Sequence, residues 1–110
     1  MNKVISFSLF GNNPKYIVGA KCNVEIAKII YSDWTCRFYC GESVDENYVQ
    51  ELKNHDNTEV ILMKENDEVP YMSWRFFAAD DSDITIFRDA DSRLSYREKN
   101  WLMSLLNLIL

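Results

Sequence analysis

The 110-residue sequence is poor in the residue types that form disulfide frameworks or zinc sites. It contains one histidine, His55, and three cysteines, Cys22, Cys36 and Cys40. An odd number of cysteines in a composition of this kind predicts free, buried thiols and a reducing compartment, which we take to be the cytoplasm. His55 lies in a polar stretch that offers too few partners at a suitable spacing for tetrahedral zinc. We therefore expect neither disulfides nor zinc.

Long runs of one residue character are also missing. No cluster of lysine and arginine is long enough to follow a phosphate backbone, and the formal net charge is −5, so we expect no nucleic-acid partner. The longest apolar segment, 102–110, is far shorter than the roughly 20 residues that span a bilayer. The serine-broken start of the chain is unlike a secretory leader. An acidic chain can still bind a small anion where a metal and one or two arginines neutralise it.

The sequence does contain a regular alternation of strand-like and helix-like segments, without an internal repeat, a low-complexity tract or a glycine–serine linker. Because 47% of the residues are hydrophobic, we expect one folded domain over residues 1–110. β-branched and aromatic residues predict strands at about 3–10, 33–40, 58–64 and 83–88. Helical spacing and helix-start signals predict helices at about 14–31, from 43, at 73–79 and from 95.

Three details of these segments make specific structural predictions. Capping-box patterns at 43–46 and 95–98 predict the starts of two helices. The uninterrupted apolar run at 60–63 is typical of a strand that is covered on both faces. Cys36 and Cys40 alternate with polar residues, so we expect both thiols to pack on one face of a sheet.

The alternation of strands and helices predicts a Rossmann-like three-layer α/β/α fold with a mainly parallel four-stranded sheet. A Rossmann-like strand order would place the first strand beside the fourth, and ligands bind beyond the carboxyl ends of two such strands. Gly11 ends the first strand and Asp89 ends the fourth. Two loops that are distant in sequence would then face one crevice.

The most informative segment is Asp89-Ala90-Asp91, where two carboxylates follow the fourth strand. Carboxylate oxygens are the hard donors that Mg²⁺ and Mn²⁺ prefer. Side chains at i and i+2 point the same way along an extended backbone, so both carboxylates can reach one ion. Asp-x-Asp by itself is a weak signal, because solvated turns and helix caps use the same residues. The hypothesis is a site for Mn²⁺ or Mg²⁺ held by Asp89 and Asp91.

Other residues near the expected crevice are candidates for nucleotide binding. Gly11 permits close approach of the backbone, and Phe10 or Tyr16 could stack on a base. An aromatic residue at a helix start more often packs against the sheet, which is the alternative for Tyr16. Arg75 lies in a very apolar segment, where its guanidinium reaches solvent, binds phosphate or forms a structural ion pair with a nearby aspartate.

Two stretches of the sequence, 73–81 and 86–95, together resemble the centre of GT-A-type glycosyltransferases and are similar to a group found in viruses and bacteria. The opening segment 5–11 also resembles that group, so the likeness extends over nearly the whole chain. The resemblance implies a nucleotide-diphosphate sugar of the UDP or GDP type as donor, and a glycan or protein hydroxyl as acceptor.

The same resemblance implies roles for individual residues. Asp89 and Asp91 would contact the metal and the ribose, with Ala90 between them at the nucleotide. Arg75 would contact the phosphates. The end of the first strand, which includes Phe10 and Gly11, would lie near the base. The resemblance does not indicate which residue is catalytic.

The chain is shorter than GT-A enzymes usually are, so the resemblance implies a truncated GT-A fold, the nucleotide-binding half. Besides a metal-dependent donor-binding half, two readings remain. One is a non-catalytic binding or interaction module of the same fold. The other is a phosphate-processing enzyme with an aspartate nucleophile, which needs more functional groups around that aspartate than the sequence offers. The apolar C-terminal helix would either pack on its own sheet or form an oligomer contact.

Overall fold

The structure of the protein is a computed structural model that describes residues 2–65, 70–90 and 94–109. Asp91, one of the two predicted metal ligands, lies outside these ranges. The elements follow the predicted alternation, with a 3₁₀ helix, η1, in place of the third α-helix. In chain order they are β1 (Lys3–Leu9), α1 (Pro14–Ile30), β2 (Thr35–Gly41), α2 (Glu46–Lys53), β3 (Thr58–Met63), η1 (Tyr71–Asp80), β4 (Ile84–Phe87) and α3 (Tyr96–Ile109).

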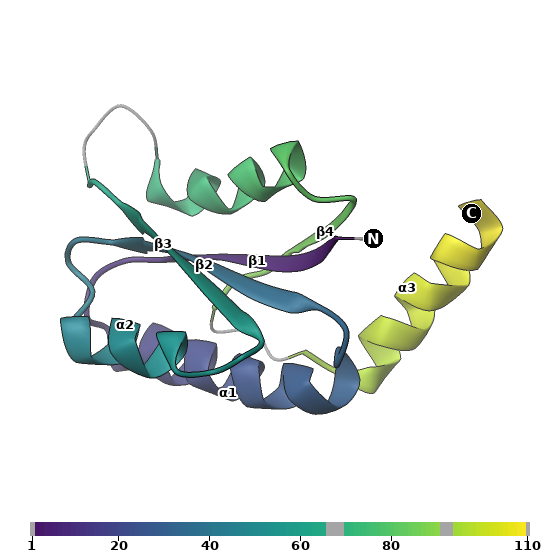
Figure 1. The fold of residues 1–110 in the computed structure, drawn as a ribbon, viewed down its shortest axis with the longest axis horizontal. Coiled ribbons are helices and arrows are strands. Elements are labelled where there is room, and N and C mark those ends of the chain that lie inside the picture. The colour runs from purple at the N-terminus through teal and green to yellow at the C-terminus, as the bar shows by residue number, and fades with distance from the viewer. Residues whose placement is uncertain (1, 66–69, 91–93, 110) are drawn as a thin grey trace.

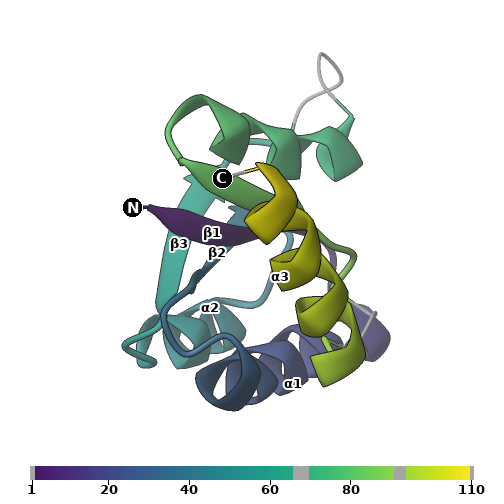
Figure 2. The ribbon, with the colours of Figure 1, turned by 90° about the vertical axis from the view of Figure 1, so that its right-hand side faces the viewer.

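The four strands form one sheet in which every pairing is parallel and the order is β3-β2-β1-β4. β1 therefore lies beside β4, as the predicted Rossmann-like order requires. α1 and α2 cover one face of the sheet and η1 lies across the other, which gives three layers (Figures 1 and 2). The predicted fold class, a three-layer α/β/α arrangement around a parallel four-stranded sheet, is confirmed.

The face of the sheet toward α1 and α2 is built from large apolar side chains. Ile5, Phe7 and Leu9 of β1 are fully or almost fully buried in this core. The Phe7 ring stacks on the Phe38 ring of β2, with 4.8 Å between the ring centroids. Burial on this scale is the main favourable contribution to folding.

The thiols lie where the alternation of β2 predicts. Cys36 and Cys40 are buried in the same core as Phe38, and all three cysteines are free. Burial raises the pKa of each of these two thiols to about 12. Cys22 on α1 is only half-buried. The two β2 cysteines are therefore packing residues, as predicted.

One of the two predicted capping boxes is wrong, and the other is only half formed. Asp45, not Ser43, caps α2, and its carboxylate accepts a hydrogen bond from the Asn47 amide at 2.8 Å. Ser43 instead bonds to groups outside the helix, as described below. At α3, the Ser95 hydroxyl accepts from the Glu98 amide at 3.2 Å. The Glu98 carboxylate, which a capping box would use to accept from the Ser95 amide, pairs with Arg88.

The prediction that the run 60–63 is covered on both faces is also wrong. β3 is an edge strand, and the Leu62 side chain is 66% exposed. α2, the helix packed next to it, has only eight residues. A helix of that length leaves part of the strand exposed to solvent, although the continuous apolar sequence of β3 is typical of a central strand.

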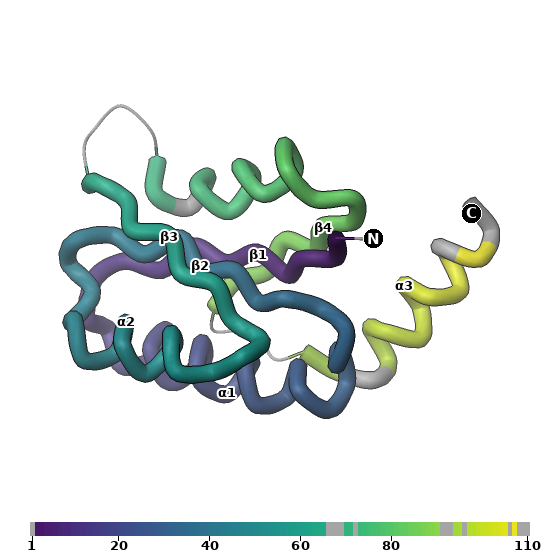
Figure 3. The backbone as a smooth tube through the Cα atoms, in the orientation of Figure 1, coloured from purple at the N-terminus to yellow at the C-terminus, as the bar shows by residue number. Residues whose placement is uncertain are grey.

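α3 contacts the rest of the molecule mainly through its beginning. Leu94 and Leu102 pack on the core that α1 covers, and the helix then leads away from the sheet (Figures 1 and 3). Trp101 is 69% exposed and Leu105 is 39% exposed. Leu102 thus packs on the core of its own domain, whereas Leu105 is among the exposed large apolar side chains. Within the described part of the chain, no helix combines the length and apolar character needed to cross a membrane.

Candidate functional site

Two serines of β1 hold η1 against the centre of the sheet. The Ser6 hydroxyl donates a hydrogen bond to the Arg75 carbonyl at 2.7 Å, and the Arg75 amide donates to the Ser8 hydroxyl at 2.9 Å. Both serines are almost fully buried on the face opposite the large apolar core. Short side chains let the helix backbone approach the strand closely. Both backbone polar groups of Arg75, its N–H and its C=O, are therefore bonded to side chains of β1.

The Arg75 side chain reaches the residue that follows β4. Its Nη1 donates to the Asp89 carboxylate, and its guanidinium lies over the Phe76 ring at 5.3 Å from the centroid. The side chain of Arg75 is 19% exposed and that of Asp89 is 48% exposed. The buried Nε of Arg75 has no acceptor among the described residues. The guanidinium therefore has Asp89 as its ionic partner, and its buried Nε donor is not used by any described residue.

Asp89 stands just beyond the hydrogen-bonded part of the sheet. The Arg88 amide donates to the Ser6 carbonyl at 3.1 Å, which continues the β1–β4 ladder past Phe87. The Arg88 side chain turns toward α3 and pairs with Glu98 at 2.9 Å. Asp89 is thus delivered to the carboxyl edge of the sheet at the boundary between β1 and β4, where the predicted strand order placed it.

A buried asparagine fixes the chain on both sides of 91–93. The Asn23 amide nitrogen donates to the Ala90 carbonyl at 3.3 Å, and its amide oxygen accepts from the Leu94 amide at 3.1 Å. Asn23 is 0% exposed and Ala90 is 3% exposed. The Ala90 methyl group packs in the core, so the exposed chemistry at this point belongs to Asp89. Asn23 was not predicted from the sequence, although a polar residue beside the apolar stripe of α1 is a usable signal.

The other predicted nucleotide-binding residues are divided among three places. Gly11 has φ +74°, and a β-carbon built there would meet nothing within 4 Å, so its backbone faces open space. That conformation explains the glycine. The Phe10 ring contacts the Tyr71 ring of η1 edge-on, with centroids 5.2 Å apart. Tyr16 is partly buried against the α1 core.

A chain of hydrogen bonds joins the loops that follow β1, β2 and β3. The Gly11 amide donates to the Ser43 hydroxyl at 2.6 Å, and both the amide and the hydroxyl of Ser43 donate to the Glu65 carboxylate. The Glu65 amide in turn donates to the Glu42 carboxylate at 3.0 Å. These bonds fix the turn at Gly11 through residues of the loops that follow β2 and β3.

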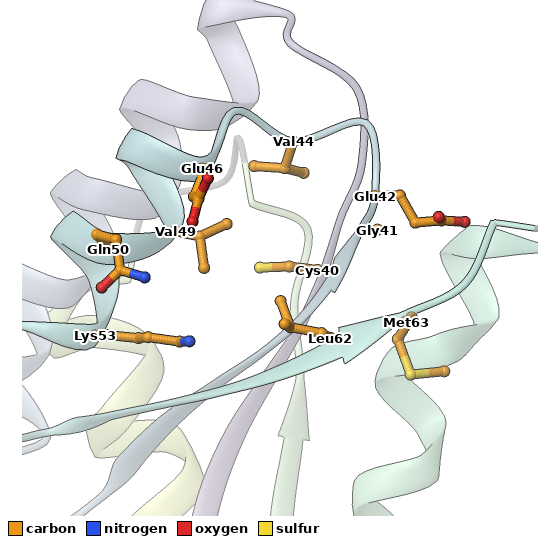
Figure 4. A pocket seen from close by; sticks show the side chains of 10 residues that line it. All are labelled: Cys40, Gly41, Glu42, Val44, Glu46, Val49, Gln50, Lys53, Leu62 and Met63. Carbon is orange, nitrogen blue, oxygen red and sulfur yellow. The ribbon is translucent and has the colours of Figure 1, made fainter.

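A cavity of about 280 Å³ lies between α2 and β3 (Figure 4). Figure 4 shows Val49 and Leu62 on opposite walls, with the Cys40 thiol between them. Glu46 and Lys53 of α2 are at its rim. None of the predicted nucleotide-binding residues lines this cavity, which is therefore a feature separate from the Arg75–Asp89 pair.

The donor set for a divalent cation is small. No group of three or more histidine, cysteine, aspartate or glutamate residues suited to a metal occurs in the described ranges 2–65, 70–90 and 94–109. Mg²⁺-type sites often use one or two carboxylates and take their remaining ligands from substrate phosphates and water. Asp89, half-exposed at the sheet edge, has the chemistry of such a site. Arg75 beside it is suited to the phosphates.

The sequence-predicted residues Arg75 and Asp89 are thus in direct contact, Phe10 is joined to η1 through Tyr71, and Gly11 belongs to the neighbouring loop network. Arranged in this way, a basic and an acidic group at the β1–β4 boundary can bind an anion and a cation side by side. Comparison of the chain with protein-family models, with curated proteins and with solved structures found no match.

Proposed function

We propose that this chain binds a nucleotide-diphosphate sugar together with Mn²⁺ or Mg²⁺ and is the donor-binding half of a GT-A-type glycosyltransferase. The observation that supports this most is the contact between Arg75 and Asp89 at the carboxyl end of β1 and β4. Ligands of open parallel sheets bind at such a position. The resemblance of the sequence to GT-A enzymes agrees with that placement.

Each residue of the pair has a distinct task in this proposal. Arg75 binds oxygens of the diphosphate with its guanidinium, whose Nε has no acceptor in the described parts of the chain. Asp89 holds the cation with a carboxylate oxygen. Asp91 joins it on the basis of sequence spacing alone, because it lies outside the described residues. When bound, the cation stabilises negative charge on the diphosphate leaving group.

The residues near the end of β1 would receive the nucleoside. Gly11 leaves its backbone open to close approach, because no atom lies within 4 Å of where a side chain would begin. Phe10 and Tyr71 offer an aromatic pair next to that backbone. Tyr71 lies four residues before Arg75 on η1, so the same element supplies both an aromatic and a cationic group.

Calorimetric titration with UDP and with GDP, each in the presence of Mn²⁺, tests the proposal. We expect binding of at least one nucleotide at millimolar concentrations or below, and a loss of tenfold or more in Asp89→Asn. Asp56→Asn is the matched control, because it removes the same charge from an exposed loop between α2 and β3. The absence of heat at millimolar nucleotide would contradict the proposal, as would equal binding by both variants.

A second candidate function is that of a non-catalytic interaction module. The exposed Trp101 and Leu105 favour it, because they form one apolar stripe of α3 at i and i+4. Incubation with UDP-glucose or GDP-mannose and Mn²⁺, followed by assay of released nucleotide, separates the two functions. Release above that of an Asp89→Asn sample would exclude a purely non-catalytic role.

A further inference from the structure

We propose that the Arg75–Asp89 ion pair acts as a mutual latch, which makes the divalent cation and the nucleotide diphosphate depend on each other for binding. The inference rests on the proposed function and adds to it the order and coupling of ligand binding. In the structure, the group that would bind the phosphates already neutralises the group that would bind the cation.

The latch disfavours the cation when it arrives alone. To reach the Asp89 carboxylate it must replace a charge-assisted hydrogen bond from Arg75. It must also come close to a guanidinium that stays charged at any ordinary pH. Coulomb repulsion between these two positive groups lowers the affinity for the cation.

The latch equally disfavours the diphosphate when it arrives alone. To reach Arg75 it must displace the Asp89 carboxylate, which is a negative group like itself. If the carboxylate were displaced without a cation to receive it, both negative charges would compete for the same guanidinium. Binding of the nucleotide without metal is therefore weak.

Arg75 has little freedom to escape from this arrangement. Ser6 and Ser8 bond to its backbone on both sides, and Phe76 lies against its guanidinium. Its side chain is only 19% exposed. The positive charge consequently remains beside Asp89 unless a competing anion draws the guanidinium away.

Both ligands together resolve the conflict. The diphosphate takes over the guanidinium, the cation takes over the carboxylate, and the two ligands attract each other. No charge is left without a partner. Coupling between two such sites is usually roughly 5–150-fold in affinity, and it is reciprocal, so each ligand strengthens the other by the same factor.

The experiment measures binding of each ligand separately and together, using the full chain. Free Mn²⁺ is followed by electron paramagnetic resonance and UDP by calorimetry, with correction for the complex that Mn²⁺ and UDP form in solution. Because that complex alone produces apparent coupling, the test depends on two variants with opposite expected effects. Circular dichroism and urea unfolding verify that each variant is folded.

Arg75→Gln removes the competitor of the cation. We expect it to bind Mn²⁺ alone several-fold more tightly than the wild type and UDP with Mn²⁺ several-fold more weakly. Asp89→Asn removes the competitor of the diphosphate, so it should bind UDP alone several-fold more tightly and lose Mn²⁺ binding. Arg97→Gln and Asp56→Asn make the same charge changes at exposed positions and should match the wild type.

The latch is overturned if Arg75→Gln binds Mn²⁺ alone no more tightly than the wild type and Arg97→Gln do. It is overturned equally if Asp89→Asn gains no affinity for metal-free UDP. Failure of the wild type to bind UDP with Mn²⁺ at all is a different result, which refutes the proposed function. In that case a gain of Mn²⁺ binding in Arg75→Gln would still support the competition at Asp89.

Discussion

The two faces of β1 carry different kinds of side chain. Toward α1 and α2, the strand presents the large side chains of Ile5, Phe7 and Leu9 to a continuous apolar core. Toward η1, it presents Val4, which packs in a smaller apolar cluster with Trp74, and the hydroxyls of Ser6 and Ser8, which bond to Arg75 of the helix. Apolar packing is strong but non-directional, whereas hydrogen bonds fix a position at a modest net gain. The first face has the larger apolar core and contributes more to stability, whereas the serines of the second face place Arg75.

The largest effect should come from the apolar face. Phe7→Ala removes a fully buried ring that stacks on Phe38, and we expect a loss of about 3–5 kcal/mol in the free energy of unfolding. Urea denaturation measures it. A loss below that of a serine substitution on the opposite face would contradict the division between the two faces.

Asn23 is the polar exception on the apolar side, and its loss should be comparable in size to that of Phe7. Asn23→Ala leaves the Ala90 carbonyl and the Leu94 amide without their buried partner, at a cost of about 1–3 kcal/mol for each unpaired group. Hydrogen exchange at Leu94 should accelerate. In Asn23→Asp, which retains the acceptor, Leu94 should remain better protected than in Asn23→Ala. Equal exchange in the two variants would argue against the bond.

On the polar face, Ser8→Ala should cost about 1 kcal/mol, because the Arg75 amide loses its acceptor. Stability should therefore fall much less than in Phe7→Ala. If the polar face positions the site, the affinity for UDP with Mn²⁺ should fall several-fold in the same variant. Unchanged nucleotide affinity in folded Ser8→Ala would show that the hydroxyl does not position Arg75.

The smallest effect concerns the thiols of the apolar face. Burial raises the pKa of Cys36 and Cys40 from an ordinary value of 9.0 to about 12. Iodoacetamide at pH 8 should therefore label Cys22 alone, as detected by mass spectrometry. Because the folded-state pKa is raised, these thiols stabilise the fold fully below pH 9, and this contribution is lost as the pH rises to about 12. Rapid labelling of Cys40 would show that the core opens.

Much of the fold could be predicted because local signals agreed with the tertiary arrangement. The strands of the sheet and their order follow from alternating apolar segments and from the parallel topology that such alternation favours. Errors occurred where a tertiary contact decided the outcome. Ser43 resembles a helix cap, but its hydroxyl instead accepts from the Gly11 amide and donates to the Glu65 carboxylate. Leu62 resembles part of a central strand, but its strand is at the edge.

The candidate site could be predicted only in part. An ion pair between Arg75 and a nearby aspartate was one of the expected alternatives, and Asp89 is that aspartate. The predicted three-layer fold covers both faces of the sheet, but the alternation of Ser6 and Ser8 with apolar residues does not indicate that these two hydroxyls bond to the backbone of Arg75. The position of Asn23 beside the apolar stripe of α1 is a local signal, but its partners lie some 70 residues away along the chain and no local pattern identifies them.

The absence of a side chain at Gly41 has a consequence for a distant turn. A β-carbon there would stand 2.8 Å from the Glu65 side chain, so even alanine would push that carboxylate out of place. Ser43 would then lose its acceptor, and the Gly11 amide would lose the hydroxyl that steadies it. One added methyl group on β2 should thus loosen the bend that follows the neighbouring strand β1, without altering any residue of that bend.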